Sequence, residues 1–443
     1  MNLPKDFIEQ MKRLLNDEYS DFEKQYDLPP TKGIRINPLK CNASILQDMG
    51  LSLDKIPYEE AYYLPYEIKL GKHPYHLGGL FYLQEPSAMI PVASIDILDR
   101  ATVLDLCSAP GGKSTQIASR IPNGILVSNE VVPDRARILQ DNIIRLGIKN
   151  CIITSNQPKV IAQQLPSTFD YVFVDAPCSG EGMFRKEEIA IKEWYKELTC
   201  TNSIRQMDIL SYAKDCVKDG GFLIYSTCTF NTLENENVIE NFLKHNNDFK
   251  LYPVKDNVRV CTANGVNLPE ARRFYPHLAK GEGQFVVILK RTGTLDSNYN
   301  LSKANISHNE QKLVDSFIST NTTLTKYCLY KIKNNIYISE HELLNTKKLN
   351  VYTYGVCLGS VEKGRLIPHH QFFIAYGDYF KNIFNYTLDS LEINKFLHGE
   401  ELSVDSNTNG YGVVQCNGYT LGGGKIVDGR LKNYYPKKLR LNV

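Results

Sequence analysis

The chain has 443 residues, of which 42% are hydrophobic and 23% charged, so it is long enough for more than one hydrophobic core. Its 51 lysines and arginines nearly balance its 49 acidic residues, and the net charge of +2 neither indicates nor excludes a nucleic-acid partner. No apolar run approaches the roughly 18 residues of a membrane span, and the eleven cysteines lack the short paired spacings of a zinc site. We therefore expect a cytoplasmic protein with reduced thiols, no membrane segment and no bound metal.

Residues 1–95 combine charged helical patterns with short β-like runs such as "TKGIRINPLK" and "GGLFYLQEP". We interpret this region as a small α+β domain. The next region, residues 96–292, alternates short apolar runs with helical patterns. Its predicted strands are 101–106, 124–130, 151–154, 169–175 and 220–227, and its clearest predicted helices are 113–120, 131–147 and 201–217. Near-continuous apolar strands separated by helices are typical of a parallel sheet covered on both faces, so we predict a doubly wound α/β domain.

The last third of the chain differs in composition. Residues 293–310 are polar and turn-rich, which predicts a linker. Residues 311–443 are rich in tyrosine, glycine and short β-like runs, and we expect a separate domain with a β-rich end. Residues 425–443 carry six basic side chains against one acidic one, so this end of the chain is a candidate contact for nucleic acid.

The segment "DLCSAPGGKST" (105–115) lies between the first predicted strand and helix, where doubly wound sheets bind their ligands. Gly111 and Gly112 would let the backbone approach a ligand closely. The segment lacks the G-x-G-x-x-G spacing of dinucleotide-binding proteins. It ends like a P-loop, but that motif requires glycine at position 107, where this chain has cysteine. A P-loop nucleoside triphosphatase is therefore only a weaker alternative.

S-adenosylmethionine carries no phosphates and needs a tight turn under its amino-acid end, together with a carboxylate for its ribose hydroxyls. Glu130 ends the second predicted strand, where an acidic residue binds the ribose in dinucleotide folds. Taken alone, Glu130 could be an exposed charge at a strand end. In combination with the glycine loop, it favours S-adenosylmethionine as the cofactor.

Two cysteines follow two of the predicted strands: Cys178 in "DAPCSG" and Cys228 in "YSTCTFN". Because the carboxyl ends of parallel strands meet at one edge of a sheet, we expect both thiols to lie over the crevice of the glycine loop. A thiolate is useful where the methyl acceptor is carbon 5 of a pyrimidine, which becomes nucleophilic only after addition at carbon 6. Asp175, before Cys178, is placed to hold such a ring at N3 and its exocyclic amine.

These motifs, with "STCT" followed by "ENEN" and with "RRFYPHLAKGEGQF", resemble the RNA cytosine-5 methyltransferases of the NOL1/NOP2/Sun family. The resemblance covers essentially the whole chain. It implies a Rossmann-like S-adenosylmethionine-dependent core between a small N-terminal α+β domain and a C-terminal PUA-like RNA-binding domain. It also implies that the substrate is 16S ribosomal RNA or the 30S subunit, and we expect a monomer.

The family resemblance assigns roles to individual residues. It implies that Cys228, in the "TC" motif, is the nucleophile and that Cys178 assists release of the product. It further implies cofactor contacts from Glu130, from Asp175 and from Asn156, where aspartate is usual. The remaining implied cofactor contacts come from the glycine loop and are Cys107, Ser108, Ala109, Pro110, Gly111, Gly112 and Lys113.

Two questions stay open at this level. Arg35 and the segment 272–275 ("RRFY") mix cations with aromatic side chains, as a path for single-stranded RNA would. The equal alternative is that these residues belong to solvated loops or that the arginines pair with the sheet. The alternative function is that of a non-catalytic ribosome-assembly protein, which would bind RNA without retaining the cofactor.

Overall fold

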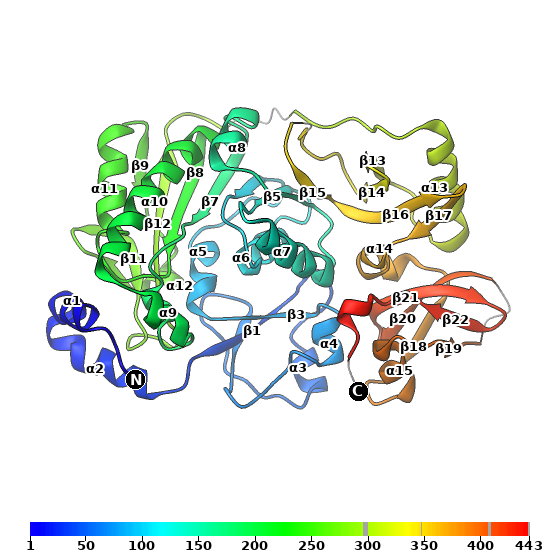
Figure 1. Ribbon diagram of the computed structural model, residues 1–443, viewed down its shortest axis with the longest axis horizontal. Helices are drawn as coiled ribbons and strands as arrows, with labels where there is room; N and C mark the ends of the chain where they lie inside the picture. The colour runs from blue at the N-terminus through cyan, green and yellow to red at the C-terminus, as the bar shows by residue number, and fades with distance from the viewer. Residues whose placement is uncertain (296–299, 347, 406–408, 442–443) are drawn as a thin grey trace.

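The computed structural model describes residues 1–295, 300–346, 348–405 and 409–441. Its central body is a ten-stranded sheet with helices, and an N-terminal three-stranded sheet lies against it (Figure 1). Two further sheets, of four and five strands, form the C-terminal side. Among the described residues, no helix combines the length and the hydropathy needed to cross a membrane.

The N-terminal region is an α+β unit, as predicted. Its sheet has the order β2-β1-β3, with antiparallel neighbours. Helix α1 packs through Phe7 and Met11 into an aromatic cluster with Phe184, Trp194 and Phe230, so this unit is joined to the central body. The main elements of the unit are α1 (Lys5–Leu15), α2 (Tyr19–Lys24), β1 (Lys32–Ile36), α3 (Ile45–Asp48), β2 (Ala61–Leu64), α4 (Pro74–Leu77), β3 (Phe81–Gln84) and α5 (Ile90–Ala93).

Nine strands of the central sheet have the order β10-β11-β12-β8-β7-β4-β5-β6-β15, and the tenth strand, β9, pairs antiparallel with β12. Strands β6, β5, β4, β7 and β8 are parallel neighbours, and β12 is antiparallel to β8. The elements of this part are β4 (Thr102–Asp105), α6 (Gly112–Arg120), β5 (Ile125–Asn129), α7 (Pro133–Leu146), β6 (Cys151–Thr154), α8 (Pro158–Gln164), β7 (Phe169–Asp175), α9 (Glu188–Glu193), α10 (Lys196–Cys216), β8 (Val217–Thr227), α11 (Glu236–His245), β9 (Phe249–Tyr252), α12 (Asp256–Arg259), β10 (Ala263–Gly265), β11 (Leu268–Phe274) and β12 (Gln284–Arg291).

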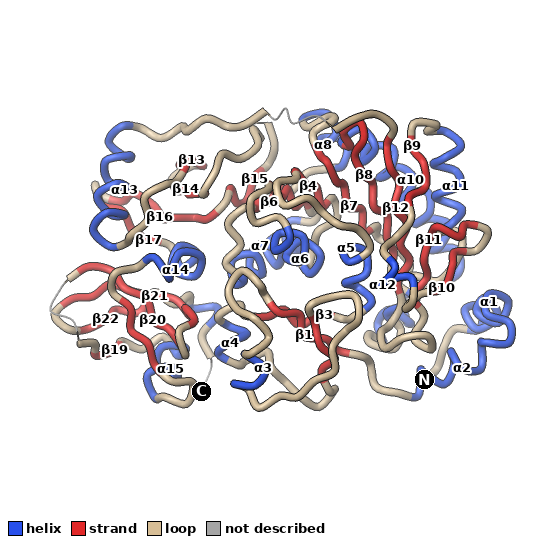
Figure 2. The backbone as a smooth tube through the Cα atoms, turned by 180° about the vertical axis from the view of Figure 1, so that it is seen from behind, coloured by secondary structure: helices blue, strands red, loops and turns tan. Residues whose placement is uncertain are grey.

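Both faces of the parallel strands are covered, which explains their unbroken apolar sequences. Residues of α8, α10 and α11 form one core with one face of the sheet, and residues of α5, α6 and α7 form a second core with the other face. Figure 2 shows the strands running between these helices. The predicted doubly wound α/β fold is confirmed. Helix α7 also starts at Pro133 and stops before Gly147, whose φ of 70° ends the helix.

The C-terminal region contributes to the central sheet, which the sequence did not predict. Strand β15, inside the predicted separate domain 311–443, pairs antiparallel with β6. The region contains α13 (His308–Asn321), β13 (Cys328–Ile332), β14 (Asn335–Ser339), β15 (Val351–Tyr354), β16 (Val356–Glu362), β17 (Arg365–Pro368), α14 (His370–Tyr376), β18 (Ile383–Tyr386), α15 (Leu391–His398), β19 (Leu402–Ser403), β20 (Gly410–Cys416), β21 (Tyr419–Val427) and β22 (Arg430–Asn433). The predicted linker 293–310 includes residues 296–299, which lie outside the described residues.

Candidate active site

A cavity of about 280 Å³ lies over the carboxyl ends of the parallel strands. Its walls come from the glycine loop after β4, the end of β5 and the loops after β7 and β8. The predicted residues that line it are Cys107, Ala109, Glu130, Asp175, Cys178 and Cys228. The two cysteines, the strand-end acids and the glycine loop therefore share one crevice.

The glycine loop turns tightly before α6 and is held in place by contacts with the residues packed against it. Gly111 has a φ of +110°, and a Cβ there would approach Leu139 to 3.1 Å. Ser108 supports the loop from inside, since its hydroxyl donates to the Asp105 carbonyl at 2.7 Å. Of the seven predicted loop residues, Cys107 and Ala109 line the cavity, whereas Ser108, Pro110, Gly111, Gly112 and Lys113 shape or support the wall.

Arg35 is one of these supports. Its side chain is buried, and its guanidinium donates to the Gly112 carbonyl at 3.1 Å and to Thr115 Oγ1 at 2.7 Å. A third bond runs to Gln84 Oε1 at 2.9 Å. The interpretation of Arg35 as an RNA contact is therefore wrong, because the N-terminal unit uses this arginine to hold the start of α6.

Glu130 faces the cavity from the end of β5. Glu130 is only 5% exposed, so the alternative that it is an exposed charge at a strand end is wrong. One carboxylate oxygen accepts from the Val132 backbone N–H at 3.0 Å, and the other lies 3.5 Å from Arg135 Nη1. These contacts fix the carboxylate in the wall, where it can accept from the two hydroxyls of a ribose.

Asn156 is not among the residues that line the cavity. Its side-chain oxygen accepts from the Asn350 N–H at 3.1 Å, and its amide donates to the Asn350 carbonyl at 3.2 Å. Asn350 precedes β15, so the added edge strand engages this side chain. The neighbouring Gln157 and Pro158 line the cavity at this point.

Asp175 ends β7 and is held mainly by two side chains, with a longer hydrogen bond from Gln284 Nε2 at 3.4 Å. Lys113 Nζ lies 2.7 Å from one carboxylate oxygen, and Ser226 Oγ donates to the other at 2.7 Å. Burial alone would lower the pKa of Lys113, but the Asp175 carboxylate outweighs it and the pKa is raised. The ammonium group therefore stays charged and keeps Asp175 fixed at the cavity wall.

The two cysteine sulfurs lie 3.2 Å apart at the floor of the cavity. The hydrogen bond to Cys228, together with burial, raises the pKa of Cys178 well above its ordinary value. Cys178 thus remains a thiol at neutral pH, and it can donate its proton to the sulfur of Cys228.

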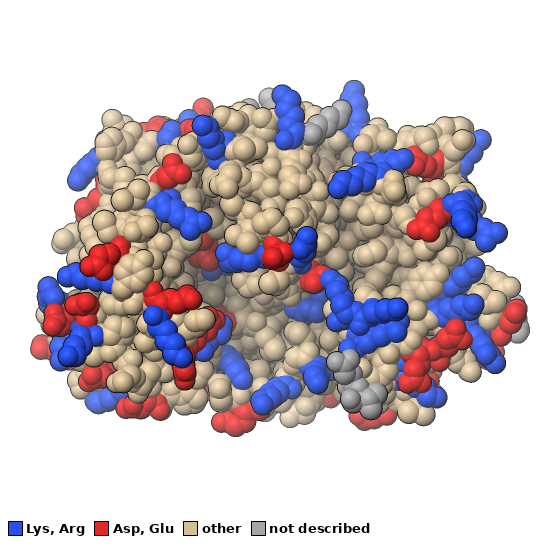
Figure 3. All heavy atoms as spheres, viewed as in Figure 1, with Lys and Arg blue, Asp and Glu red and all other residues tan. Residues whose placement is uncertain are grey.

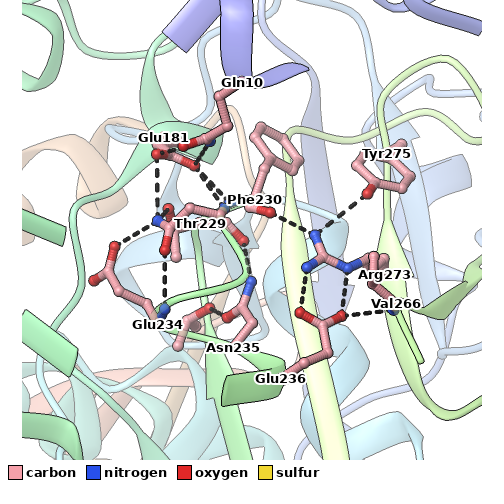
Figure 4. Close-up of polar contacts among 12 residues, drawn as sticks. Gln10, Glu181, Thr229, Phe230, Glu234, Asn235, Glu236, Val266, Arg273 and Tyr275 are labelled. Carbon is pink, nitrogen blue, oxygen red and sulfur yellow. Dashed lines mark hydrogen bonds and ion pairs between the residues drawn. The ribbon is translucent and has the colours of Figure 1, made fainter. Parts of the chain in front are cut away.

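The segment 272–275 is buried under the loop that follows Cys228 (Figure 4). Arg273 is 2% exposed and donates to the two carboxylate oxygens of Glu236 at 2.7 and 2.5 Å. It also donates to the Phe230 carbonyl at 2.5 Å. Arg272, Phe274 and Tyr275 are buried as well. The interpretation of this segment as an RNA path is therefore wrong, and its arginines pair within the fold.

The sequence analysis did not predict four polar residues that line the cavity: Arg135, Gln157, Arg205 and Asp208. Arg205 and Asp208 lie almost one turn apart on α10 and are exposed at the cavity. Their spacing predicts a shared helix face, but the sequence does not say that this face points to the strand ends. Within the described ranges, no group of three or more His, Cys, Asp or Glu residues is placed to hold a metal ion.

Three family models match successive parts of the chain. The 16S rRNA methyltransferase RsmB/F model matches residues 92–290, the model of the N-terminal domain of 16S rRNA methyltransferase RsmF matches residues 3–86, and the methyltransferase RsmF PUA domain model matches residues 384–441. The ribosomal RNA small subunit methyltransferase F of Aeromonas salmonicida (strain A449) is 31% identical, with 99% of this chain and 97% of that protein covered. The protein of the same name from Vibrio vulnificus (strain YJ016) is 29% identical with the same coverage.

Solved structures agree with these matches. A methyltransferase homolog protein from Pyrococcus horikoshii has a TM-score of 0.56 at 26% identity and covers 65% of this chain and 95% of its own. NSun6 from the same organism, solved with SFG, has a TM-score of 0.59 at 20% identity, covers 66% and 99%, and shows the fold alone.

The expected methyltransferase fold, the RNA cytosine-5 methyltransferase class and S-adenosylmethionine as the cofactor are confirmed by these matches. The full-length similarity also extends to the N-terminal domain and to the C-terminal PUA domain. The chain belongs to the ribosomal RNA small subunit methyltransferase F family.

Proposed function

We propose that this chain methylates carbon 5 of a cytidine in 16S ribosomal RNA through a transient covalent bond from Cys228 to carbon 6. The observation that carries the proposal is the pair of sulfurs 3.2 Å apart in the same cavity as Glu130, Asp175 and the glycine loop. An enzyme that methylates an amine or a hydroxyl has no need of a second thiol at that place.

Attachment follows from the chemistry of the pyrimidine ring. When Cys228 Sγ bonds to carbon 6, the electrons of the ring double bond move to carbon 5, which can then attack a methyl group. The Cys178 thiol favours this step because its hydrogen bond stabilises a thiolate on Cys228. Asp175, fixed by Lys113 and Ser226, can accept from the exocyclic amine and from N3 once that nitrogen is protonated.

S-adenosylmethionine, when bound, supplies the methyl group. Glu130 would accept from its ribose hydroxyls, and Cys107 and Ala109, which line the cavity, would hold its amino-acid end. After transfer, a base must take the proton from carbon 5, so that this electron pair reforms the double bond and expels the Cys228 sulfur. Cys178 is within reach to protonate the departing sulfur, which accounts for the release role that the family resemblance implies.

The target cytidine must be unpaired or turned out of its helix, because stacking hides carbons 5 and 6. We propose that affinity for the RNA comes mainly from the C-terminal region, with Lys425, Arg430, Lys432 and Lys437 partly or fully exposed. Figure 3 shows basic side chains gathered where Figure 1 draws the end of the chain. We further propose that the protein is a cytoplasmic monomer without a bound metal. Its proposed domains are residues 1–95, 96–292 and 311–443, although β15 of the last domain belongs to the central sheet.

The test is methylation of 30S subunits and of bare 16S ribosomal RNA with labelled cofactor, followed by digestion to nucleosides. Label should appear in 5-methylcytidine, and Cys228→Ala should abolish it. Label in another nucleoside, or none with either substrate, would contradict the proposal. The non-catalytic alternative predicts RNA binding without cofactor binding, so calorimetric titration with S-adenosylmethionine separates the two functions.

A further inference from the structure

Two fully buried glutamates connect the loops that carry the active-site cysteines. The Cys178 loop, residues 176–181, follows β7 and ends at Glu181. The Cys228 loop, residues 228–235, follows β8 and contains Glu234. Neither glutamate lines the cavity, so neither touches the substrate or the cofactor in the function proposed above.

Glu234 binds the residue that follows Cys178. Its carboxylate accepts from the Ser179 backbone N–H at 2.9 Å and from the Ser179 hydroxyl at 2.5 Å. Gln206 of α10 donates to the same carboxylate at 3.0 Å and to the Pro177 carbonyl at 2.9 Å. Ser179, after Cys178, is therefore bound by Glu234 of the Cys228 loop, and Pro177, before Cys178, is bound by Gln206, which also binds Glu234.

Glu181 makes the reverse connection. One of its oxygens accepts from the backbone N–H groups of Phe230 and Asn231, both at 2.9 Å (Figure 4). Gln10 of α1 donates to both oxygens at 3.1 Å. Each cysteine loop thus supplies a buried carboxylate that takes backbone donors of the other loop.

The donors around these carboxylates are neutral. In the part of the chain that the structure describes, neither Glu181 nor Glu234 forms an ion pair, in contrast to Glu236 with Arg273. Burying a carboxylate without a counter-charge is costly, and burial raises the pKa of Glu234 in spite of its donors. A local loss of stability of this kind is typical of functional sites, where the arrangement of the residues is kept for activity.

We propose that Glu234 and Glu181 are positioning residues that hold the Cys178 sulfur against the Cys228 sulfur. The inference rests on the proposed function, in which both thiols act on the same cytidine. If the connection is loosened, Cys228 still attaches to carbon 6, but Cys178 is no longer in place to assist release. Loss of this connection should therefore slow release more than attachment.

Disulfide formation by diamide measures the approach of the two sulfurs without any methyl transfer. Diamide takes two electrons and two protons from the thiols and is reduced to its hydrazine. The 3.2 Å between the sulfurs must shorten to about 2.05 Å, which is a small movement in the native arrangement. The rate is followed by mass spectrometry of the peptide pair that contains Cys178 and Cys228.

Two variants and one control test the proposal. Glu234→Gln turns an acceptor oxygen into a donor, and Ser179→Ala removes one donor with less risk to folding. Tyr225→Phe is the control, because the Tyr225 hydroxyl donates at 2.6 Å to the main-chain carbonyl of Glu234 and not to its carboxylate. Disulfide formation should slow by about tenfold in both variants, the worth of one charge-assisted hydrogen bond, and stay near the wild-type rate in the control.

A second measurement uses the complete reaction with RNA and cofactor. Glu234→Gln and Ser179→Ala should accumulate a denaturation-resistant protein–RNA adduct while binding S-adenosylmethionine like the wild type. Wild-type disulfide rates in a folded Ser179→Ala variant, or equal slowing in Tyr225→Phe, would overturn the proposal. If the wild type makes no 5-methylcytidine, the proposed function fails, while the disulfide rates still decide whether Glu234 positions the sulfurs.

Discussion

Replacing Arg273 with methionine tests whether this arginine stabilises the fold or binds RNA. The substitution removes four hydrogen bonds: two to Glu236, one to the Phe230 carbonyl and one to the Tyr275 hydroxyl. The Glu236 carboxylate keeps the Val266 N–H at 3.0 Å. Breaking one side of a buried ion pair costs about 3–5 kcal/mol. We expect the free energy of unfolding to fall by that amount, and the double variant Arg273→Met/Glu236→Met to recover part of it.

Trp194 provides the assay, because it is the single tryptophan of the chain and packs in the aromatic cluster that contains Phe230. Its fluorescence should report urea unfolding of this region. The urea concentration at the unfolding midpoint should be lower by about 1–2 M in Arg273→Met than in the wild type. Affinity for 16S ribosomal RNA should keep its salt dependence, whereas loss of a phosphate contact would lower the slope by about 0.7–0.9. An unchanged unfolding midpoint together with a lower slope would refute the structural role.

Three further predictions concern the site and the C-terminal region. Cys178→Ala should accumulate a covalent RNA adduct on a denaturing gel and Cys228→Ala should form none; the reverse pattern would exchange their roles. Glu130→Ala should weaken S-adenosylmethionine binding by about ten- to a hundredfold in calorimetry, because two charge-assisted hydrogen bonds are lost, and an unchanged affinity would place the ribose elsewhere. Burial lowers the pKa of His370 to about 3, so the unfolded state takes up a proton first as the pH falls below 6.5. The free energy of unfolding should therefore fall by about 1.4 kcal/mol between pH 8 and pH 5.5 because of this histidine. In urea unfolding, His370→Phe should show a fall that is smaller by this amount.

The sequence predicts the parts of this protein that depend on local patterns. Pro133 and Gly147 mark the ends of α7, and the apolar strands place Cys178, Cys228 and Glu130 at one edge of a sheet by topology alone. This is why a crevice with two thiols could be expected before any distance was known. The motif resemblance then supplied the division of roles between the thiols, which geometry does not contain.

The sequence does not predict partners that lie far apart in the chain. Arg273 pairs with Glu236, 37 positions away, and Arg35 with Thr115, 80 positions away, so neither burial nor partner could be found from local composition. A cation beside aromatic residues has the same local appearance on an RNA surface and inside a core. The contact of Asn156 with Asn350 was not predicted for a similar reason, because β15 brings Asn350 to it.

The pairing of β15 with β6 has a consequence for any shortened form of this enzyme. A fragment that stops before residue 311 would keep the whole cavity but leave the backbone of β6 open along one side. Because β6 is the short apolar run "CIIT", that open side is a template for intermolecular strand pairing. Such a fragment should aggregate unless a strand is supplied, because β15 covers this edge in the full chain.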